Sequence, residues 1–343
     1  MSETIILGIE TSCDETAAAV VADGRRLLSN LIASQIDTHR EYGGVVPEIA
    51  ARKHLESISY IINEALRQAD LSLSDIHGVA VSNGPGLVGA LLVGLSFAKS
   101  LAFTQRIPLL GVNHIYSHIC ANYLSGQGSP WEPPFICLVA AGGHSHLIEV
   151  LDYHKCRVLA RTRDDAAGEA FDKVGRSLGL PYPGGPEIDR LAKQGNPQAI
   201  NFPRTIFEDS FDFSFSGLKS AVLQYLQKNK DSNISDVAAS FQQAVIDVLV
   251  SRTIAACTKT GLKKVALAGG VAANTGLREA MTKASKQQGL SLHLPQAVYC
   301  TDNAAMVASG GYYRYINDTP DNLDLNAYPN MDIEADIYGQ IFS

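Results

Sequence analysis

Two histidines, His114 and His118, lie four residues apart in the segment NHIYSHIC. If this segment is a helix, side chains at i and i+4 project from one face, so both imidazoles can reach a single metal ion. A zinc-protease HExxH motif would place a glutamate after the first histidine, but Ile115 occupies that position, which excludes this motif. The spacing also arises by chance, so a metal site needs a third ligand.

Carboxylates in turn segments are candidates for that ligand or for acid–base chemistry. Asp14 and Glu15 follow a strand-like run in GIETSCDET, and Asp172 lies in an acidic segment. Asp302 comes just before a helix predicted to begin at Ala304. Two histidines and one carboxylate with open coordination positions are typical of non-haem iron or catalytic zinc. Structural roles stay open as well, because Asp and Asn often cap helices or bond their own turn.

The elements that must position these residues alternate between strand and helix. Apolar runs predict strands, and apolar residues at helical spacing predict helices. The predicted strands are 5–10, 17–22, 76–82, 109–112, 135–141, 146–151 and 264–268, and the predicted helices are 46–69, 87–103, one from 114, 236–259 and 276–288. This alternation indicates a layered α/β fold with a mixed sheet.

Each half of the chain begins with a predicted hairpin that has a polar or glycine-rich tip. Such a repeat indicates an internal duplication that closes on a central cleft, where the turns at the strand ends converge. We expect an N-terminal domain at 1–133, a C-terminal domain at 134–315 and a tail at 316–343. A helix at about 302–316 is expected to pack back on the first domain. Closure of the two halves over such a cleft would bring carboxylates from distant turns, with Asp302 as one candidate, to the histidine pair.

Composition narrows the class of protein. The chain has 343 residues, of which 46% are hydrophobic and 18% charged, which indicates a folded protein of two domains. The net charge of −7 argues against indiscriminate binding to nucleic acid. Six cysteines without a CxxC pair indicate reduced thiols. No basic region precedes the first apolar run, and 87–103 is too short and too charged for a membrane span, so we expect a cytoplasmic protein with no membrane partner.

The turn and helix motifs together resemble one known family. They occur in a fixed order along the chain: GIETSCDET (8–16), YGGVVPE (42–48), GPGLVGALLVG (84–94), NHIYSH (113–118), GGHSHL (142–147), DDAAGEAFDKVGRSLGL (164–180), YPGGP (182–186), FDFSFSGLK (211–219), AGGVAAN (268–274) and CTDN (300–303). This series resembles the bacterial-type tRNA N6-adenosine threonylcarbamoyltransferases (TsaD family), formerly called O-sialoglycoprotein endopeptidases.

The resemblance implies a duplicated actin-like, sugar-kinase and heat-shock-ATPase (ASKHA) fold with two domains around a central cleft. It implies transfer of a threonylcarbamoyl group from threonylcarbamoyl-AMP to N6 of adenosine 37 of tRNAs that read codons starting with A. It also implies two protein partners, a paralogous dimerisation partner (TsaB) and a small P-loop ATPase (TsaE). One divalent ion is expected in each subunit, Fe²⁺ first and Zn²⁺ as the alternative.

The resemblance also assigns residues to the site. The metal ligands would be His114, His118 and Asp302, and the catalytic acids would be Asp14 and Glu15. The substrate-binding residues would be Val139, Ala140, Ala141, Gly142, Gly143, Asp172, Gly185, Asp189 and Asn274.

The sequence departs from the family pattern at two places. Ala141 stands where the family commonly has Ser, so one hydroxyl contact is lost or is supplied by Ser145. The tail lacks the basic, proline-containing ending common in bacterial members, which puts a role of the tail in tRNA binding in question.

Two alternative functions remain open. An ATPase or kinase of the same fold would leave the histidine pair without a role, and a non-catalytic scaffold would not need the metal set.

Overall fold

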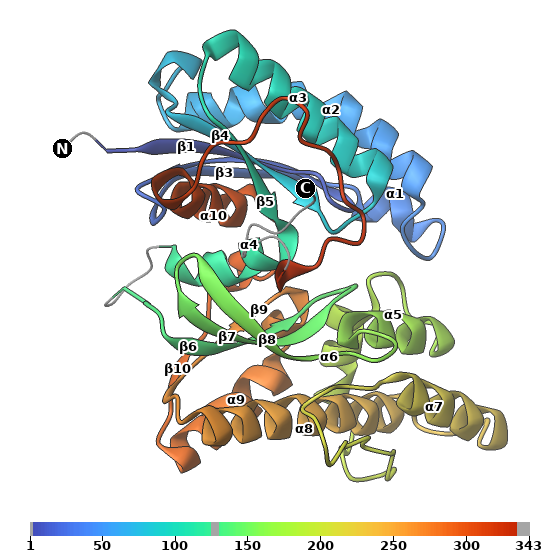
Figure 1. Cartoon of the computed structure of the whole chain (residues 1–343). Coiled ribbons are helices and arrows are strands. Elements are labelled where there is room, and N and C mark those ends of the chain that lie inside the picture. The colour runs from blue at the N-terminus through green and yellow to red at the C-terminus, as the bar shows by residue number, and fades with distance from the viewer. Residues whose placement is uncertain (1–2, 125–129, 335–343) are drawn as a thin grey trace. The chain divides into compact units, whose positions relative to one another are not determined.

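The computed structural model describes residues 3–124 and 130–334 (Figure 1). The chain forms two compact units. Unit 1 contains residues 1–132, 152–156 and 302–343, and unit 2 contains residues 133–151 and 157–301. The domain boundaries expected from the sequence stay a prediction. Residues 335–343 of the predicted tail lie outside the described residues.

Unit 1 is built on a five-stranded mixed sheet with the order β3-β2-β1-β4-β5. The first three strands form an antiparallel meander, whereas β4 runs parallel to β1 and β5 runs parallel to β4. The strands are β1 (Ile5–Glu10), β2 (Glu15–Ala22), β3 (Arg26–Ser34), β4 (Gly78–Gly84) and β5 (Leu109–Asn113). The sequence predicted all of these strands except β3, an edge strand whose mixed apolar and polar residues are mostly half-buried.

Helices cover both faces of the unit 1 sheet. Helices α2 and α3 pack on one face, and α10 packs against β1 and β4 on the other (Figure 1). Small residues allow α10 to approach closely, since a Cβ added at Gly8 would lie 2.3 Å from the carbonyl oxygen of Ala304. The helices are α1 (Ile36–Arg40), α2 (Pro47–Gln68), α3 (Val88–Gln105), α4 (His114–Cys120) and α10 (Ala304–Asn317).

Helix α3 differs from the buried helix that the sequence predicted. By length and composition it is the one helix in the described part of the chain that could cross a membrane. Its residues Leu91 and Leu95 are buried where α3 packs against β4 and α2, but Leu92 and Phe103 are exposed. Only one face of α3 therefore belongs to the core.

Unit 2 repeats the topology of unit 1 in a second five-stranded sheet, with the order β10-β9-β6-β7-β8. Its first strand again pairs with an antiparallel hairpin partner on one side and a parallel strand on the other. The strands are β6 (Phe135–Ala140), β7 (Ser145–Asp152), β8 (Lys155–Arg161), β9 (Lys264–Ala268) and β10 (Ser291–His293). The predicted duplication is therefore confirmed, although β8, the counterpart of β3, was not predicted.

The core of unit 2 is centred on the long helix α8, which packs against β6, α6 and α9. Fully buried aromatic side chains, including Phe213, Phe215 and Phe241, fill this core. The helices are α5 (Ala167–Ser177), α6 (Gly184–Ala192), α7 (Ser216–Lys228), α8 (Ile234–Thr260) and α9 (Thr275–Gln288). The predicted pattern contained α8 and α9 but not α5, α6 and α7.

The described part of the tail packs on unit 1. The carboxylate of Asp321 accepts a hydrogen bond from the backbone of Gly111 at 2.7 Å and pairs with Arg314 at 3.3 Å. The backbone amide of Tyr328 donates to the carbonyl of Asn83 at 2.8 Å. Residues of the tail therefore extend the packing of β4 and β5.

Candidate metal centre and active site

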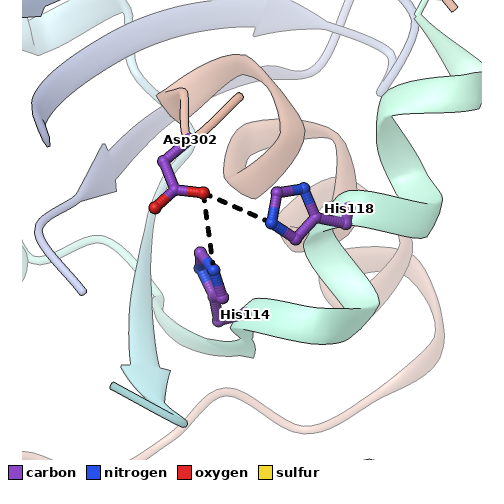
Figure 2. A group of neighbouring side chains, drawn as sticks. All are labelled: His114, His118 and Asp302. Carbon is purple, nitrogen blue, oxygen red and sulfur yellow. Dashed lines mark ion pairs between the residues drawn. The ribbon is translucent and has the colours of Figure 1, made fainter. Parts of the chain in front are cut away.

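The two histidines lie on α4, which begins directly after β5. The side chain of Asn113 caps this helix by accepting hydrogen bonds from the amides of Ile115 and Tyr116 at 2.9 and 3.2 Å. His114 is the first residue of the helix and His118 lies one turn later, so both rings project from the same face (Figure 2). Their side chains are buried, with exposed fractions of 8% and 1%.

Asp302 lies beside this pair. Its Oδ1 is 3.3 Å from Nε2 of His118 and 3.6 Å from Nε2 of His114 (Figure 2). The neighbouring Asn303 caps α10 by accepting a hydrogen bond from the amide of Met306 at 3.1 Å. Asn303 thus performs the capping role that the sequence left open between the two residues, and Asp302 faces the histidines.

All three residues belong to unit 1. The expectation that two halves must close over a cleft to bring Asp302 to the histidines is therefore wrong. The chain returns to unit 1 at residue 302, and the contact of α10 with α4 brings the carboxylate to the histidines.

The three side chains fit a metal ion. One ligand atom from each lies within 4.8 Å of the others. Both ring nitrogens of His118 are buried and have no hydrogen-bond partner among the described residues. Buried polar atoms are normally hydrogen-bonded, so a buried Nε2 that faces a carboxylate without a hydrogen bond fits coordination of a shared cation. Two imidazoles and a carboxylate are a donor set for divalent iron or zinc.

A further carboxylate, which the sequence pattern did not single out, lies behind His114. Glu10 is the last residue of β1, is fully buried, and places Oε2 3.1 Å from Nδ1 of His114. Burial disfavours the imidazolium, but the charges of Glu10 and Asp302 outweigh burial and raise the pKa of His114 to about 9. The available signal was a charged residue at the end of an otherwise apolar run.

Asp14 lies in the turn between β1 and β2, and Glu15 is the first residue of β2; both belong to unit 1. Burial, followed by the charge of Asp302, raises the pKa of Asp14. Glu15 accepts a hydrogen bond from the hydroxyl of Ser34 at 2.8 Å, whereas its Oε2 is buried without a hydrogen-bond partner in the described chain. Burial raises the pKa of Glu15 to about 8, against the hydrogen bond from Ser34 and with smaller increases from Asp14 and Asp302. Asp14 and Glu15, which are adjacent in the chain, therefore both have carboxyl groups with raised pKa values.

Buried polar residues that the sequence did not single out hold this turn. Nε2 of His54 lies 3.0 Å from the carbonyl oxygen of Cys13, and Nδ1 lies 2.8 Å from the hydroxyl of Thr16. The amide of Gln35 donates to the carbonyl of Asp14 at 3.1 Å. Helix α2 and the end of β3 thus fix the backbone on which the two acids stand.

The predicted substrate residues lie in unit 2, at the carboxyl end of β6. Val139 and Ala140 end the strand, and Gly142 and Gly143 form an exposed tip around which a Cβ would meet nothing within 4 Å. The turn after β9 lies close to the end of β6, since a Cβ at Gly269, with φ +85°, would lie 2.4 Å from the carbonyl oxygen of Ala140. The glycine tip is therefore exposed, with open space where a side chain would lie.

The polar residues predicted to bind substrate tie the neighbouring turns together. Asp172 accepts a hydrogen bond from the amide of Gly184 at 2.7 Å, next to Gly185. Asp189 accepts one from the hydroxyl of Thr275 at 2.9 Å.

Asn274 and Ser145 are also engaged within unit 2. Asn274 caps α9 through Oδ1 and donates from Nδ2 to Gln242 at 2.7 Å. The hydroxyl of Ser145 is fully buried and accepts from the amide of Ala167 at 2.9 Å, and its role in place of a hydroxyl at Ala141 stays a prediction.

The repeated sheet topology, with helices packed against each copy, is that of the ASKHA fold, and the buried His-His-Asp group adds a candidate metal centre. A solved structure of HypF from T. kodakarensis is similar, with a TM-score of 0.62 and 16% identity over 92% of this chain and 49% of that chain. Component A of the (R)-2-hydroxyglutaryl-CoA dehydratase of Acidaminococcus fermentans has a TM-score of 0.54 and 17% identity, over 92% of this chain and 100% of that chain. At these identities the similarity shows the fold alone.

Sequence similarity is far more specific. The family model for tRNA N6-adenosine threonylcarbamoyltransferase, TsaD, matches residues 26–309. A protein of this name from Clostridioides difficile is 54% identical over 338 residues, covering 97% of this chain and 99% of the relative. One from Clostridium botulinum is 55% identical over 337 residues, covering 96% and 98%. The chain belongs to the TsaD family.

Proposed function

We infer that this chain transfers the threonylcarbamoyl group of threonylcarbamoyl-AMP to N6 of adenosine 37 in tRNAs that read codons starting with A, which forms t6A. The observation that carries this inference is the match to named transferases over almost the whole chain, at more than half identical residues. A tRNA substrate also supports a cytoplasmic location.

In the proposed reaction, the exocyclic N6 attacks the carbamoyl carbon of the adenylate. A bond forms between nitrogen and carbon, the bond from carbon to the phosphate oxygen breaks, AMP leaves, and N6 loses one proton. We assign acceptance of that proton to Asp14, with Glu15 beside it, because burial raises the pKa values of both carboxyls. A base whose pKa approaches the working pH transfers protons efficiently.

His114, His118 and Asp302 are the proposed ligands of one divalent ion, with Fe²⁺ as the first assignment and Zn²⁺ as the alternative. Support comes from the donor set and from the unsatisfied nitrogens of His118. When bound, such an ion supplies a Lewis acid that stabilises negative charge on oxygen.

The glycine tip of unit 2 is the proposed binding site for the adenylate. Exposed amides at Gly142 and Gly143 suit a phosphate group, and Val139, Ala140 and Ala141 position that tip at the end of β6. Asp172, Asp189 and Asn274 already have partners within unit 2, so their proposed role is to hold the turns around Gly185 and the start of α9 for the nucleoside.

We also propose that the chain works with the paralogous partner TsaB and the P-loop ATPase TsaE. Unit 1 has an apolar surface that supports binding to another protein. Leu55 on α2 is 66% exposed, and Leu92 on α3 is 43% exposed. A hollow of about 330 Å³ lies between the two helices, lined partly by Leu55 and Leu92. Exposed apolar side chains that gather on one face mark interaction sites.

The test of the reaction combines the purified chain, both partners, synthetic threonylcarbamoyl-AMP and unmodified tRNA. Nucleoside mass spectrometry should detect t6A and AMP in equal amounts. A control tRNA with guanosine at position 37 should yield none. Absence of t6A from the complete mixture would contradict the proposed function.

A further inference from the structure

Glu10 makes a set of contacts that is unusual for a residue at the end of a strand. The carboxylate is fully buried in unit 1. Oε1 accepts a hydrogen bond from the amide of Ser12 at 2.5 Å, and Oε2 accepts one from the hydroxyl of Ser82 at 2.5 Å. Oε2 also lies 3.1 Å from Nδ1 of His114. A buried carboxylate with this many partners is held in one orientation.

The two nitrogens of the His114 ring face different groups. Nδ1 faces Glu10, and Nε2 faces Oδ1 of Asp302 at 3.6 Å. A neutral imidazole carries its proton on only one nitrogen, and a metal ion needs the lone pair of the other. An ionised carboxylate can only accept a hydrogen bond, so Glu10 keeps the proton on Nδ1, and Nε2 is the nitrogen whose proton a metal ion replaces.

A second contact of Nδ1, with Ser12, could allow the other tautomer of His114. The hydroxyl of Ser12 also lies 3.1 Å from Nδ1 of His114. A hydroxyl can donate as well as accept, so Ser12 alone would permit the opposite tautomer, with the proton on Nε2 and no lone pair for a metal. Ser12 therefore does not select a tautomer, whereas Glu10 does.

We propose that Glu10 is a positioning residue that fixes His114 as an Nε2 metal ligand. This proposal rests on the metal site given under the proposed function. A carboxylate behind a ligating histidine fixes its tautomer and orientation, and loss of such a partner typically lowers metal affinity 10- to 100-fold. His118 is different, because its Nδ1 has no hydrogen-bond partner among the described residues. The two histidines are thus unequal, and Glu10 acts on one of them.

The first test measures Zn²⁺ affinity of the full chain by competition with a chromophoric chelator. Glu10→Gln keeps the size of the side chain but removes the charge, and should weaken Zn²⁺ binding by about 10- to 100-fold. Ser12→Ala is the matched control and should change the affinity less than about threefold. A folded Glu10→Gln protein that binds Zn²⁺ as tightly as the parent would overturn the proposal, even if its melting temperature falls.

His114→Ala separates this proposal from the metal site itself. If His114→Ala binds Zn²⁺ normally, the metal site is wrong. If only Glu10→Gln binds normally, the site stands and the role of Glu10 is wrong.

The second test does not depend on a folded variant. Nitrogen-15 NMR of the zinc-loaded parent chain, labelled at histidine, reports which nitrogen of His114 binds the ion. We expect zinc on Nε2 and a proton on Nδ1 that exchanges slowly with water. Zinc on Nδ1 would overturn the proposal.

Discussion

At the scale of single residues, unequal surroundings give similar side chains different roles. Asp302 faces two imidazoles, whereas the next residue, Asn303, caps α10. Glu15 has one satisfied and one unsatisfied buried oxygen, so its carboxyl holds its proton more strongly than a solvated one. The surroundings of Asp302 and Glu15 therefore suit metal binding or proton transfer, whereas Asn303 has a structural role at the start of α10.

His114→Ala should abolish threonylcarbamoyl transfer and metal retention while the chain stays folded. The ring is one of three candidate ligands and lies on a helix that its own Asn113 cap stabilises. Nucleoside mass spectrometry, metal analysis and circular dichroism together check this. His154→Ala, at an exposed histidine, should behave like the parent chain. Full t6A formation by His114→Ala would refute the metal hypothesis.

Glu15 should make the chain less stable as pH rises. Its pKa is raised from 4.5 to about 8 in the folded chain, so between these values the unfolded chain releases a proton that the folded chain keeps. Folding stability must then fall as pH increases across this window. Melting temperatures measured from pH 5 to 8 should decline less steeply for Glu15→Gln than for the parent. Parallel declines would show that Glu15 titrates normally.

At the scale of elements, the position of α10 decides where Asp302 lies. The helix approaches β1 and β4 closely, because a Cβ at Gly8 would meet the carbonyl of Ala304 and one at Gly311 would lie 2.3 Å from Cβ of Ala80. These contacts leave little freedom to the segment that carries the third ligand. Packing of a terminal helix and geometry of the metal group are therefore linked.

Gly8→Ala should displace α10, lower stability by about 1–3 kcal/mol and weaken metal binding. Thermal unfolding and Zn²⁺ competition check both effects. Gly217→Ala is the control, because a Cβ there meets nothing within 4 Å and Gly217 lies in α7 of unit 2. That control should leave metal affinity unchanged. If the Gly8→Ala protein bound Zn²⁺ as tightly as the parent, the position of α10 would not determine metal binding.

The elements also show how far the sequence could predict the fold. The long amphipathic helix α2, the long and largely buried helix α8 and the apolar strands β1 and β4 were predictable, because their patterns reflect burial directly. The edge strands β3 and β8 are only partly buried, so their patterns are weak. Helices α5, α6 and α7 were missed although α5 and α6 are amphipathic, because they are short and the glycines at their beginnings resemble turn signals.

The site was predictable to a different extent. The spacing of His114 and His118 suggested a shared ligand, but several carboxylates remained candidates for the third until the family resemblance selected Asp302. Glu10 was missed because nothing local distinguishes it from a charged residue at a strand end. Its role arises from a contact with His114, far along the chain, which spacing cannot reveal.

At the scale of the whole molecule, the two sheets repeat one topology but carry different groups. Unit 1 holds the His-His-Asp group and the carboxyls of Asp14 and Glu15, whereas unit 2 holds the glycine tip at the end of β6. Duplication supplied two similar sheets whose strand ends could then diverge.

The apolar surface on α2 and α3 should be required for partner binding. Leu92→Glu places a charge where Leu92 is 43% exposed, and should reduce association with the paralogous partner while the melting temperature stays within a few degrees of the parent. Val298→Glu, at a side chain of unit 2 that is 50% exposed, is the matched control. Analytical ultracentrifugation of the mixtures checks both variants. Equal association by Leu92→Glu would exclude this surface.

The return of the chain to unit 1 at residue 302 has a consequence for biosynthesis. The histidines are translated early, but their carboxylate partner emerges from the ribosome only after all of unit 2. A nascent or prematurely terminated chain that stops before Asp302 can offer an ion two ligands but not the third. If the proposed ligand set is right, the complete metal site can form only late in translation, after α10 has been made and docked.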